Sequence, residues 1–381
     1  MVVNAYIFET RGGRMVTEFE PLDVKWNAAT NAAEDVTVTI DLRNAVEAAR
    51  DWRSLATPWK HSIAIDTGTR VLGGPILPST MTDDDGKLQI VARGVVVLFD
   101  RFPILPVAVL TRPEDQRLTL PNGLPDPAVD TTLSGLDYGT IGKRLIQQAL
   151  AWPGGADLPI VFQDDRTGSR EKTYPAVDMK KVGDALVDLS KLENGCDFRF
   201  QLRWRDDTRL EWFFETGTEQ TPRLQSPDIS AWEVGDGSGL KVETNPSRMA
   251  SIVWSIAGRS SDIVLARMRY ESALIDHGFP LLFTDSGVSP TASDPTTLDS
   301  RNVEALRTAA KPWEFWSFSI SAADAGAFNV REGDYLDVIV TADANVSGGF
   351  VAAGTYRRRV AALSGTLGDW VTITCGEVYD G

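Results

Sequence analysis

The same order of sequence signals occurs near both ends of the chain, and this approximate repeat constrains the fold more than any other feature. Each copy has an apolar run, a glycine turn, a long strand-like segment and a further apolar strand. The first copy occupies residues 63–65, 68–71, 72–81 and 88–92, and the second occupies residues 338–340, 354–357, 358–367 and 370–374. The repeat predicts two related β-barrels at the chain ends, with other material inserted between them. An ordinary antiparallel meander gives the same order of signals, and this alternative stays open.

Length and composition favour a globular protein of several domains. The 381 residues suggest two or three domains, and 43% hydrophobic and 24% charged residues are close to average globular usage. Acidic residues exceed basic ones by 53 to 38, which gives a net charge of −15. A general nucleic-acid-binding protein would be basic, so that class is disfavoured.

Neither a secretory signal nor a membrane span is expected. The first residues lack a basic segment followed by a long apolar one. The longest apolar stretch, residues 95–110, is interrupted by Asp100, Arg101, Pro103 and Pro106 and cannot span a bilayer. We therefore expect a soluble protein that is made in a cytoplasm and does not insert into a membrane.

The chain has few side chains suited to metal or nucleophilic chemistry. Its only cysteines are Cys196 and Cys375, and its only histidines are His61 and His277. A structural zinc site usually takes four Cys or His ligands, and two cysteines cannot hold a four-cysteine iron–sulfur cluster. Both cysteines lie in apolar, strand-like runs, so we expect them to be reduced and inert. No metal and no cofactor are expected.

No catalytic residue is assigned. A serine triad needs a histidine base and an exposed turn such as Gly-x-Ser-x-Gly, and the sequence contains no such turn. His61 lies at the entrance of a predicted strand. His277 follows Asp276 and forms with it the one candidate dyad, but a helix C-cap or a loop position is the favoured interpretation. We expect no enzyme activity.

Several short motifs resemble binding loops but lack a required residue. Near the segment 139–143, Asp137 stands where a phosphate loop needs its first glycine. The segment 235–239 lacks the spacing of a dinucleotide fingerprint and is interpreted as a flexible loop. The acidic turn 83–86 has Ala92 where a calcium loop has its Glu.

The chain contains 11 tryptophans, which could indicate sugar stacking. Four of them are predicted to lie on buried faces or at strand ends: Trp204, Trp212, Trp254 and Trp370. Core packing or subunit contacts therefore explain them more simply than a sugar site does.

Residues 1–102 are predicted to form the first β-barrel domain. A hairpin is expected around the turn 11–14, and apolar residues alternate with polar ones over residues 36–42. A short helix is expected at residues 44–52, with Asn44 as its cap. Further strands are expected at residues 62–66, 70–81 and 87–98.

Residues 103–230 are predicted to form an inserted α+β domain of two helices and an aromatic β-hairpin. Ser134 is the predicted cap of the first helix, which ends at Leu150. Asp178 is the predicted start of the second helix, and Gly195 is its predicted left-handed C-terminal residue. Apolar residues alternate on both sides of the turn 206–208, which indicates the hairpin.

Residues 231–381 are predicted to form a second β-barrel domain with a helix. Asp294 is placed to cap a helix that continues to Ala310. Strands are expected at residues 251–256, 263–269, 314–321, 335–340, 355–363 and 370–378. The predicted fold class is therefore α+β and β-rich.

Two groups of motifs give the chain a resemblance to a known family. The first is Trp59-Lys60-His61-Ser62-Ile63, followed by Arg70-Val71-Leu72-Gly73-Gly74-Pro75-Ile76. The second is His277-Gly278-Phe279-Pro280-Leu281-Leu282, followed by the helix 294–310 and the segment 330–335. With these motifs the chain resembles the minor tail proteins, or baseplate hub proteins, at the tail tip of long-tailed (siphovirus-type) actinobacterial bacteriophages. Many relatives have Glu where this sequence has Phe283, so no role is carried over to that position.

The resemblance implies an architecture and no reaction. Such hubs resemble a trimeric ring in which each subunit contributes two tail-tube-like β-barrel domains, so that three subunits present six similar domains. The implied partners are two further copies of the chain, distal tail or tube proteins, the tape measure protein and central-fibre or receptor-binding proteins. The implied location is the tail tip of the virion, which is assembled in the host bacterial cytoplasm.

Phage DNA is implied to pass through the channel of the ring without specific binding. The acidic net charge suits a lining that repels DNA, and Asp83, Asp84 and Asp85 are candidates for it. Two other functions stay open. One is a carbohydrate- or receptor-binding tail-tip module that uses the tryptophans, and the other is a cell-wall hydrolase built on Asp276 and His277 or on paired carboxylates.

Overall fold

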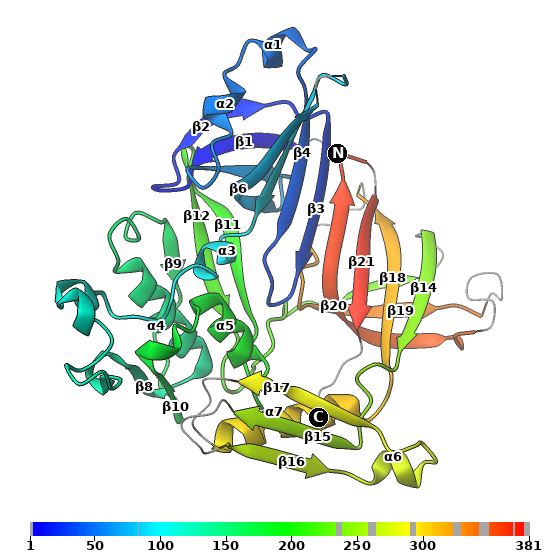
Figure 1. Ribbon diagram of the computed structural model, residues 1–381. Helices are drawn as coiled ribbons and strands as arrows, with labels where there is room; N and C mark the ends of the chain where they lie inside the picture. The colour runs from blue at the N-terminus through cyan, green and yellow to red at the C-terminus, as the bar shows by residue number, and fades with distance from the viewer. Residues whose placement is uncertain are drawn as a thin grey trace.

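The structure is rich in strands, and a single sheet joins the two ends of the chain. The computed structural model describes residues 3–82, 84–233, 238–257, 264–289, 295–322, 329–342, 350–368 and 370–376. Within these residues the strands form one 13-stranded sheet and three small sheets. Figure 1 shows the first strands at the top, the inserted region at the left and the last strands at the right.

The first part of the large sheet comes from the N-terminal region, which also has three short helices. Its strands are β1 (Asn4–Glu9), β2 (Met15–Phe19), β3 (Asp23–Ala29), β4 (Asp35–Asp41), β5 (His61–Asp66), β6 (Val71–Thr82) and β7 (Lys87–Arg93). The helices are α1 (Ala45–Ala48), α2 (Trp52–Leu55) and α3 (Val96–Phe99). Val36, Val38 and Ile40 of β4 are buried and alternate with less buried polar residues, as the period of two predicts.

The last part of the large sheet comes from the C-terminal region. Its strands are β13 (Ser230–Glu233), β14 (Ser238–Asn245), β18 (Trp313–Ser321), β19 (Tyr335–Val340), β20 (Gly354–Thr366) and β21 (Trp370–Gly376). Here too the burial alternates, since Trp316, Phe318 and Ile320 of β18 are buried. These three residues occupy the same positions in the last part of the sheet as Val36, Val38 and Ile40 occupy in the first part.

The two parts have the same strand order, which agrees with the repeat seen in the sequence. Hydrogen-bonded neighbours run β1-β5-β6-β7-β4-β3 in the first part and β13-β19-β20-β21-β18-β14 in the last. Corresponding pairs are antiparallel, except that β13 is parallel to β19 whereas β1 is antiparallel to β5. By their pairing registers, residues 63–65 occupy the same sheet positions as residues 336–338. The sequence repeat related residues 63–65 to residues 338–340, which lie two positions further along.

Strand β3 joins the two parts (Figure 1). One edge of β3 pairs with β4 and the other edge pairs with β20, where Trp26 lies opposite Gly365. Buried side chains from both parts form one hydrophobic core, which includes Ile7, Ile90 and Ile373. Among the described residues the path of paired strands is open at β2 and β14, so no closed barrel is found. The β-rich α+β fold class is confirmed.

Strand β6 changes its partner at two adjacent glycines. Residues 71–75 pair with β5, and residues 76–82 pair with β7. At Gly73, where φ is 141°, a Cβ atom would lie 1.9 Å from the carbonyl oxygen of Ile63. At Gly74 it would lie 2.1 Å from the carbonyl oxygen of Arg93. Only glycine permits such close backbone approach, which gives the Gly-Gly motif a structural reason.

The inserted region packs helices against a three-stranded sheet. Its elements are η1 (Val107–Thr111), η2 (Glu114–Gln116), η3 (Pro127–Val129), β8 (Thr131–Leu136), α4 (Tyr138–Leu150), β9 (Ile160–Phe162), β10 (Arg170–Tyr174), η4 (Ala176–Asp178), α5 (Val182–Ser190), β11 (Phe198–Asp206) and β12 (Arg209–Thr216). Phe200 and Phe214 of the β11–β12 hairpin share a core with α4 and α5. Phe8 and Ala64 of the large sheet enter the same core and anchor the inserted region to the first part.

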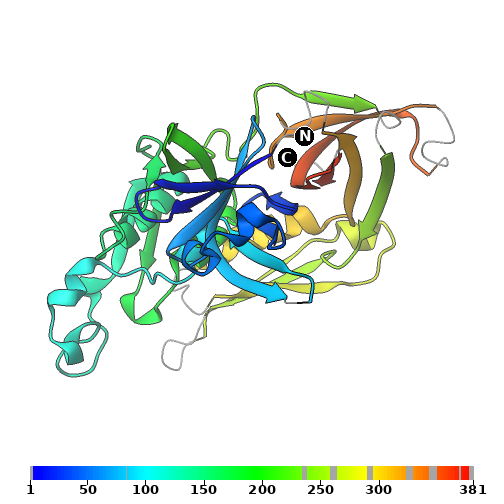
Figure 2. The same ribbon diagram turned by 90° about the horizontal axis from the view of Figure 1, so that it is seen from above.

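A further small sheet has the order β16-β15-β17. Its elements are β15 (Ile252–Ala257), β16 (Ala266–Tyr270), α6 (Ala273–Asp276), β17 (Phe283–Ser289) and the helix α7 (Pro295–Ala309). Leu306 and Ala309 of α7 pack against Ala250 and Val253, so the helix covers one face of this sheet. Figure 2 shows α7 between this sheet and the rest of the molecule.

Two predicted elements of the first part differ from the structure. The helix predicted at residues 44–52 is two short helices, although Asn44 does cap α1 by accepting a hydrogen bond from the Val46 N–H. The strand predicted at residues 87–98 ends at Arg93, because the chain turns into α3.

The inserted helices begin and end at other residues than predicted. Asp137 caps α4, since its Oδ1 accepts a hydrogen bond of 2.6 Å from the Thr140 N–H, whereas Ser134 lies in β8. Asp178 lies in η4, ahead of α5. Asn194, with φ of 56°, takes the left-handed conformation predicted for Gly195.

Candidate functional site

Neither histidine belongs to a catalytic arrangement in the described structure. His61 is buried in β5, and burial lowers its pKa. His277 is the C-cap of α6, as favoured from the sequence, and its Nδ1 lies 2.6 Å from the carbonyl oxygen of Ala273. Asp276 accepts a hydrogen bond from Ser272 Oγ at 2.8 Å. In the described residues Asp276 accepts no hydrogen bond from the His277 imidazole.

The cysteines are buried and free, as predicted. Burial raises the pKa of both Cys196 and Cys375 to about 12, so each thiol stays protonated at neutral pH. Within the described ranges, no group of three or more His, Cys, Asp or Glu side chains could hold a metal ion. No helix in the described part of the chain is long and apolar enough to cross a bilayer.

The motifs that resemble binding loops belong to the scaffold. Residues 139–143 lie inside α4, and the cavity beside them measures about 10 Å³, which is too small for a phosphate group. Asp84 and Asp85 form the turn between β6 and β7. Asp83, residues 235–237 of the predicted glycine-rich loop and the predicted cap Asp294 lie outside the described residues.

The four tryptophans singled out in the sequence have different surroundings. Trp212 is buried in the inserted region, and Trp204 is half-buried. Trp370 is 48% exposed at the start of β21. Trp254 is 41% exposed on the open face of its sheet, so the prediction of a buried face is wrong for this residue.

The open face of the β16-β15-β17 sheet is apolar. α7 covers the opposite face, and exposed large side chains gather on the open one. These are Trp254, Ile256, Met268, Tyr270 and Phe283, each at least 41% exposed. An uncovered apolar sheet face of this kind is a candidate interaction surface.

A buried ionic cluster lies where the two parts of the large sheet meet. Arg70, which precedes β6, forms an ion pair with Glu332, which precedes β19. Its Nη2 also lies 3.8 Å from Glu34 Oε1, in the turn between β3 and β4. Burial raises the pKa of Glu34 to about 7; Arg70 opposes the increase and Glu332 adds to it. Burial also acts to raise the pKa of Glu332, but Arg70 and other donors hold it below its ordinary value.

Asp197 connects three regions of the chain. Its side chain is fully buried and forms ion pairs with Arg359 of β20 and Arg223. It also accepts hydrogen bonds of 3.0 Å from Asn31 Nδ2 and from the Leu224 N–H. The inserted region is thereby fixed to both parts of the large sheet, next to their joint. Asp197 and the Arg70 cluster therefore connect segments that lie far apart in the sequence.

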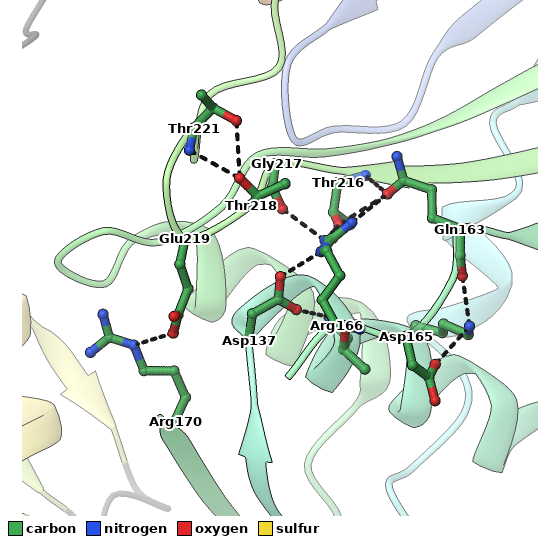
Figure 3. Close-up of polar contacts among 12 residues, drawn as sticks. Asp137, Gln163, Asp165, Arg166, Arg170, Thr216, Gly217, Thr218, Glu219 and Thr221 are labelled. Carbon is green, nitrogen blue, oxygen red and sulfur yellow. Dashed lines mark hydrogen bonds and ion pairs between the residues drawn. The ribbon is translucent and has the colours of Figure 1, made fainter. Parts of the chain in front are cut away.

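A second polar cluster holds the inserted region together (Figure 3). The guanidinium of Arg166 lies at its centre and donates to Asp137 at 2.5 Å, to Thr216 Oγ1 at 2.6 Å and to the Gly217 carbonyl at 2.9 Å. Asp137 is also the cap of α4, so one carboxylate connects the helix, the Arg166 loop and the end of β12. Each nitrogen of the Arg166 guanidinium and each carboxylate oxygen of Asp137 has a hydrogen-bond partner within the protein. A polar network satisfied in this way is typical of a structural role.

Two large cavities lie beside α7. Their volumes are about 720 Å³ and about 690 Å³, and charged residues of both signs line them. Neither lining includes a histidine or a cysteine. No described arrangement pairs an activated nucleophile with a base.

Comparison with known proteins identifies the fold. No protein-family model matches the chain, and no curated protein matches its sequence. A tail protein from Neisseria meningitidis has a similar structure, with a TM-score of 0.55 and 10% identity over 98% of this chain and 96% of that one. The 43 kDa tail protein of prophage MuSo2 from Shewanella oneidensis gives a TM-score of 0.52 at 10% identity over 98% of each chain. The chain therefore has the β-rich fold of phage tail proteins.

Proposed function

We propose that this chain is a structural virion protein, the minor tail protein that forms the hub at the tip of a long-tailed bacteriophage of the actinobacterial type. The observation that carries the proposal is the duplicated strand order within a fold that tail proteins share over almost the whole chain. The hub joins the tail tube to the distal tip components and is opened or displaced when the genome leaves. It catalyses no reaction in this proposal.

The hub is a homotrimeric ring in this proposal. Each chain contributes two alike β-rich parts, so three chains present six alike units around one axis. Such a ring adapts a sixfold tube to a threefold tip. The chain is divided into a first tube-like domain (1–102), an inserted α+β domain (103–230) and a second tube-like domain (231–381).

The ring encloses the channel through which phage DNA leaves. The net charge of −15 keeps DNA from adhering to such a lining, because like charges repel. Asp84 and Asp85, exposed in the β6–β7 turn, are the described candidates for it. The partners are the other tail proteins of the virion, and the apolar face of the β16-β15-β17 sheet is the surface offered to one of them.

The mass of the purified chain in solution tests this function. Sedimentation analysis over a range of concentrations is expected to give a species of three chain masses, and electron microscopy is expected to show a ring of six similar lobes around a hole. A chain that stays monomeric at all concentrations contradicts the hub. The hydrolase alternative has its own test, which is zymography on cell-wall material with loss of the signal in His277→Ala.

One observation favours a carbohydrate-binding role as the second candidate. Trp254 is 41% exposed beside other apolar groups, and aromatic faces stack on sugar rings. Binding to a glycan array that is lost in Trp254→Ala would support this role. The same variant would keep its trimeric mass, because Trp254 lies outside the large sheet.

A further inference from the structure

We propose that β14 of one chain pairs with β6 of the next chain, in the same register in which β3 pairs with β20 inside each chain. This inference rests on the proposed ring and specifies the contact that would close it. The partner is a second copy of this chain. The contact is a strand-to-strand pairing that reproduces a joint already present within the molecule.

The pairing registers define which residues of the two parts correspond. Val38 and Phe318 are the central buried residues of β4 and β18, and they lie opposite Ile90 and Ile373. Ile90 and Ile373 in turn lie opposite Ser79 of β6 and Leu363 of β20. Ser79 therefore corresponds to Leu363, and two residues further on Met81 corresponds to Gly365.

The same comparison relates β3 to β14. Trp26 of β3 lies opposite Val36, and Val242 of β14 lies opposite Trp316. Val36 and Trp316 are the first buried residues of their strands, so Trp26 corresponds to Val242. Lys25 then corresponds to Lys241, which is the same residue type.

Within the chain, the joint uses one edge of β3 and half of one edge of β20. β20 pairs with β19 along residues 354–359 and with β3 along residues 362–366, and β21 occupies its other edge. In the first part, β5 covers residues 71–75 of β6. No strand of the described residues covers the same edge of β6 along residues 78–82, which correspond to residues 362–366. These five residues are exposed.

The counterpart edge is also open. β14 pairs only with β18 among the described strands, whereas β3 pairs with both β4 and β20. Each chain thus has one open edge that matches β3 and one open edge that matches β20. Open strand edges are templates for pairing with another chain. A head-to-tail contact of this kind generates a closed ring when its rotation closes.

In both joints a large side chain faces a smaller residue, but the large one lies on β3 inside the chain and on β6 between chains. Inside the chain, Gly365 faces Trp26, and a Cβ on Gly365 would lie 2.7 Å from the indole ring. Between chains, the large side chain is on the β6 side and the small one on the β14 side, because Met81 faces Val242. Met81 is 59% exposed in the single chain although it points to the same face as buried Leu88. A neighbouring β14 would cover it.

The outward-facing pairs are equally compatible. Thr366 lies opposite Lys25 inside the chain, and the corresponding pair between chains is Thr82 and Lys241, with the same two residue types. Ser364 opposite Asn27 becomes Thr80 opposite Glu243. Pro78, which lacks an N–H group, falls at the end of the ladder and in the β6 bulge between Ile76 and Ser79, where proline is tolerated.

Disulfide trapping in the full-length chain tests the register. The variant Thr80→Cys with Glu243→Cys places one thiol on each open edge, and residues directly opposite each other are close enough for a disulfide. We expect covalent dimers and closed covalent trimers after oxidation, with no larger species. The native Cys196 and Cys375 are buried and do not interfere.

Two matched variants control the trapping. Ser364→Cys with Asn27→Cys places thiols at the corresponding positions of the internal joint and is expected to form a disulfide within one chain. Thr80→Cys with Thr244→Cys shifts the register by one residue, puts the thiols on opposite faces and is expected to give no cross-link. Cross-linking of the shifted pair, but not of the aligned pair, overturns the proposed register.

A charge substitution tests the contact without thiols. Met81→Lys is expected to raise the concentration for half-association by at least about tenfold, because a lysine would be buried without a partner. Leu124→Lys, at a position with the same 59% exposure in the inserted region, is expected to leave association unchanged. A trimer that forms in Met81→Lys and lacks the aligned cross-link disproves this pairing but leaves the ring intact. Absence of any trimer in the unmodified chain overturns the ring itself.

Discussion

Glu34 lies beside Arg70 and Glu332, so two carboxylates share one guanidinium at the joint of the large sheet. Its ordinary pKa of 4.5 rises to about 7. Between these values the folded chain binds a proton that the unfolded chain releases. The contribution of Glu34 to stability therefore decreases as the pH rises from about 4.5 through 7.

The variant Glu34→Gln is expected to remove this loss. At pH 5 its free energy of unfolding should be close to that of the unmodified chain, and by pH 8 it should be higher, by up to about 3 kcal/mol. Urea unfolding at pH 5, 6.5 and 8 measures the difference. Glu332→Gln is the control with the opposite sign, because the lowered pKa of Glu332 makes its charged form stabilising above its ordinary range. A difference that stays constant with pH would contradict the assigned coupling.

Asp197 is predicted to be the most sensitive carboxylate of the molecule to truncation. Asp197→Ala leaves Arg359 and Arg223 without their buried partner, so the free energy of unfolding is expected to fall by about 3 to 5 kcal/mol. Asp337→Ala removes the partner of Arg357 at an exposed pair and is expected to cost about 1 kcal/mol or less. Denaturant titration of both variants measures this. Equal losses would show that Asp197 is not the connecting residue described here.

These residues could not be selected from the sequence. Glu34, Arg70 and Asp197 have no local pattern that separates them from the other charged residues, and they meet only because distant segments pair. Asp137 is different, because a helix followed it in the prediction and carboxylates are preferred caps. Ser134 is also a residue type preferred at caps, but it lies in the short strand β8, which has no clear local signal in the sequence.

At the scale of elements, the joint depends on strand β3, which is absent from the elements predicted from the sequence. Val24, Trp26 and Ala28 alternate with polar residues, so the period-two signal was present. The signal is short, and Ala and Asn are weak strand formers. Strands with longer alternation, such as β4 and β18, were predicted correctly. β14 was also missed, so neither the central strand of the internal joint nor the open-edge strand of the proposed contact between chains was predicted from its local sequence.

The contact of β3 with β20 predicts an exchangeable pair of side chains. Gly365→Met is expected to destabilise the chain by about 1 to 3 kcal/mol, because its side chain would overlap the Trp26 indole. Adding Trp26→Val reproduces the pair Met81 and Val242 and should restore part of the loss. A double-mutant cycle with urea unfolding measures the coupling. Purely additive losses would contradict the size complementarity inferred for the two joints.

At the scale of the whole molecule, the two parts of the large sheet share one core, so they are predicted to unfold together. Amides of β4 and β21, which belong to different parts, should exchange with opening free energies within about 1 kcal/mol of each other. Hydrogen exchange with mass spectrometry measures this. As a reference, the small β16-β15-β17 sheet has a core of its own and is expected to open independently. Much faster exchange in β21 than in β4 would contradict a shared core.

The order β5-β6-β7 and its counterpart β19-β20-β21 could be predicted from the repeat, but the union of the two parts could not. A repeat within the sequence reports that two segments fold alike, because like patterns of turns and apolar residues give like meanders. It contains no information on which edge of one unit meets the other. That choice depends on complementary surfaces such as Gly365 and Trp26, which lie more than three hundred positions apart in the numbering.

The direction of one edge strand has a consequence for any assembly built from this chain. β1 runs antiparallel to β5, whereas its counterpart β13 runs parallel to β19, so the duplicated units are near-copies that differ at a single border. Around the proposed annulus this difference would recur at every second position. A protein that binds over that border would therefore have three equivalent binding sites on the ring instead of six. The chain itself would thereby impose the change from sixfold to threefold stoichiometry between tube and tip.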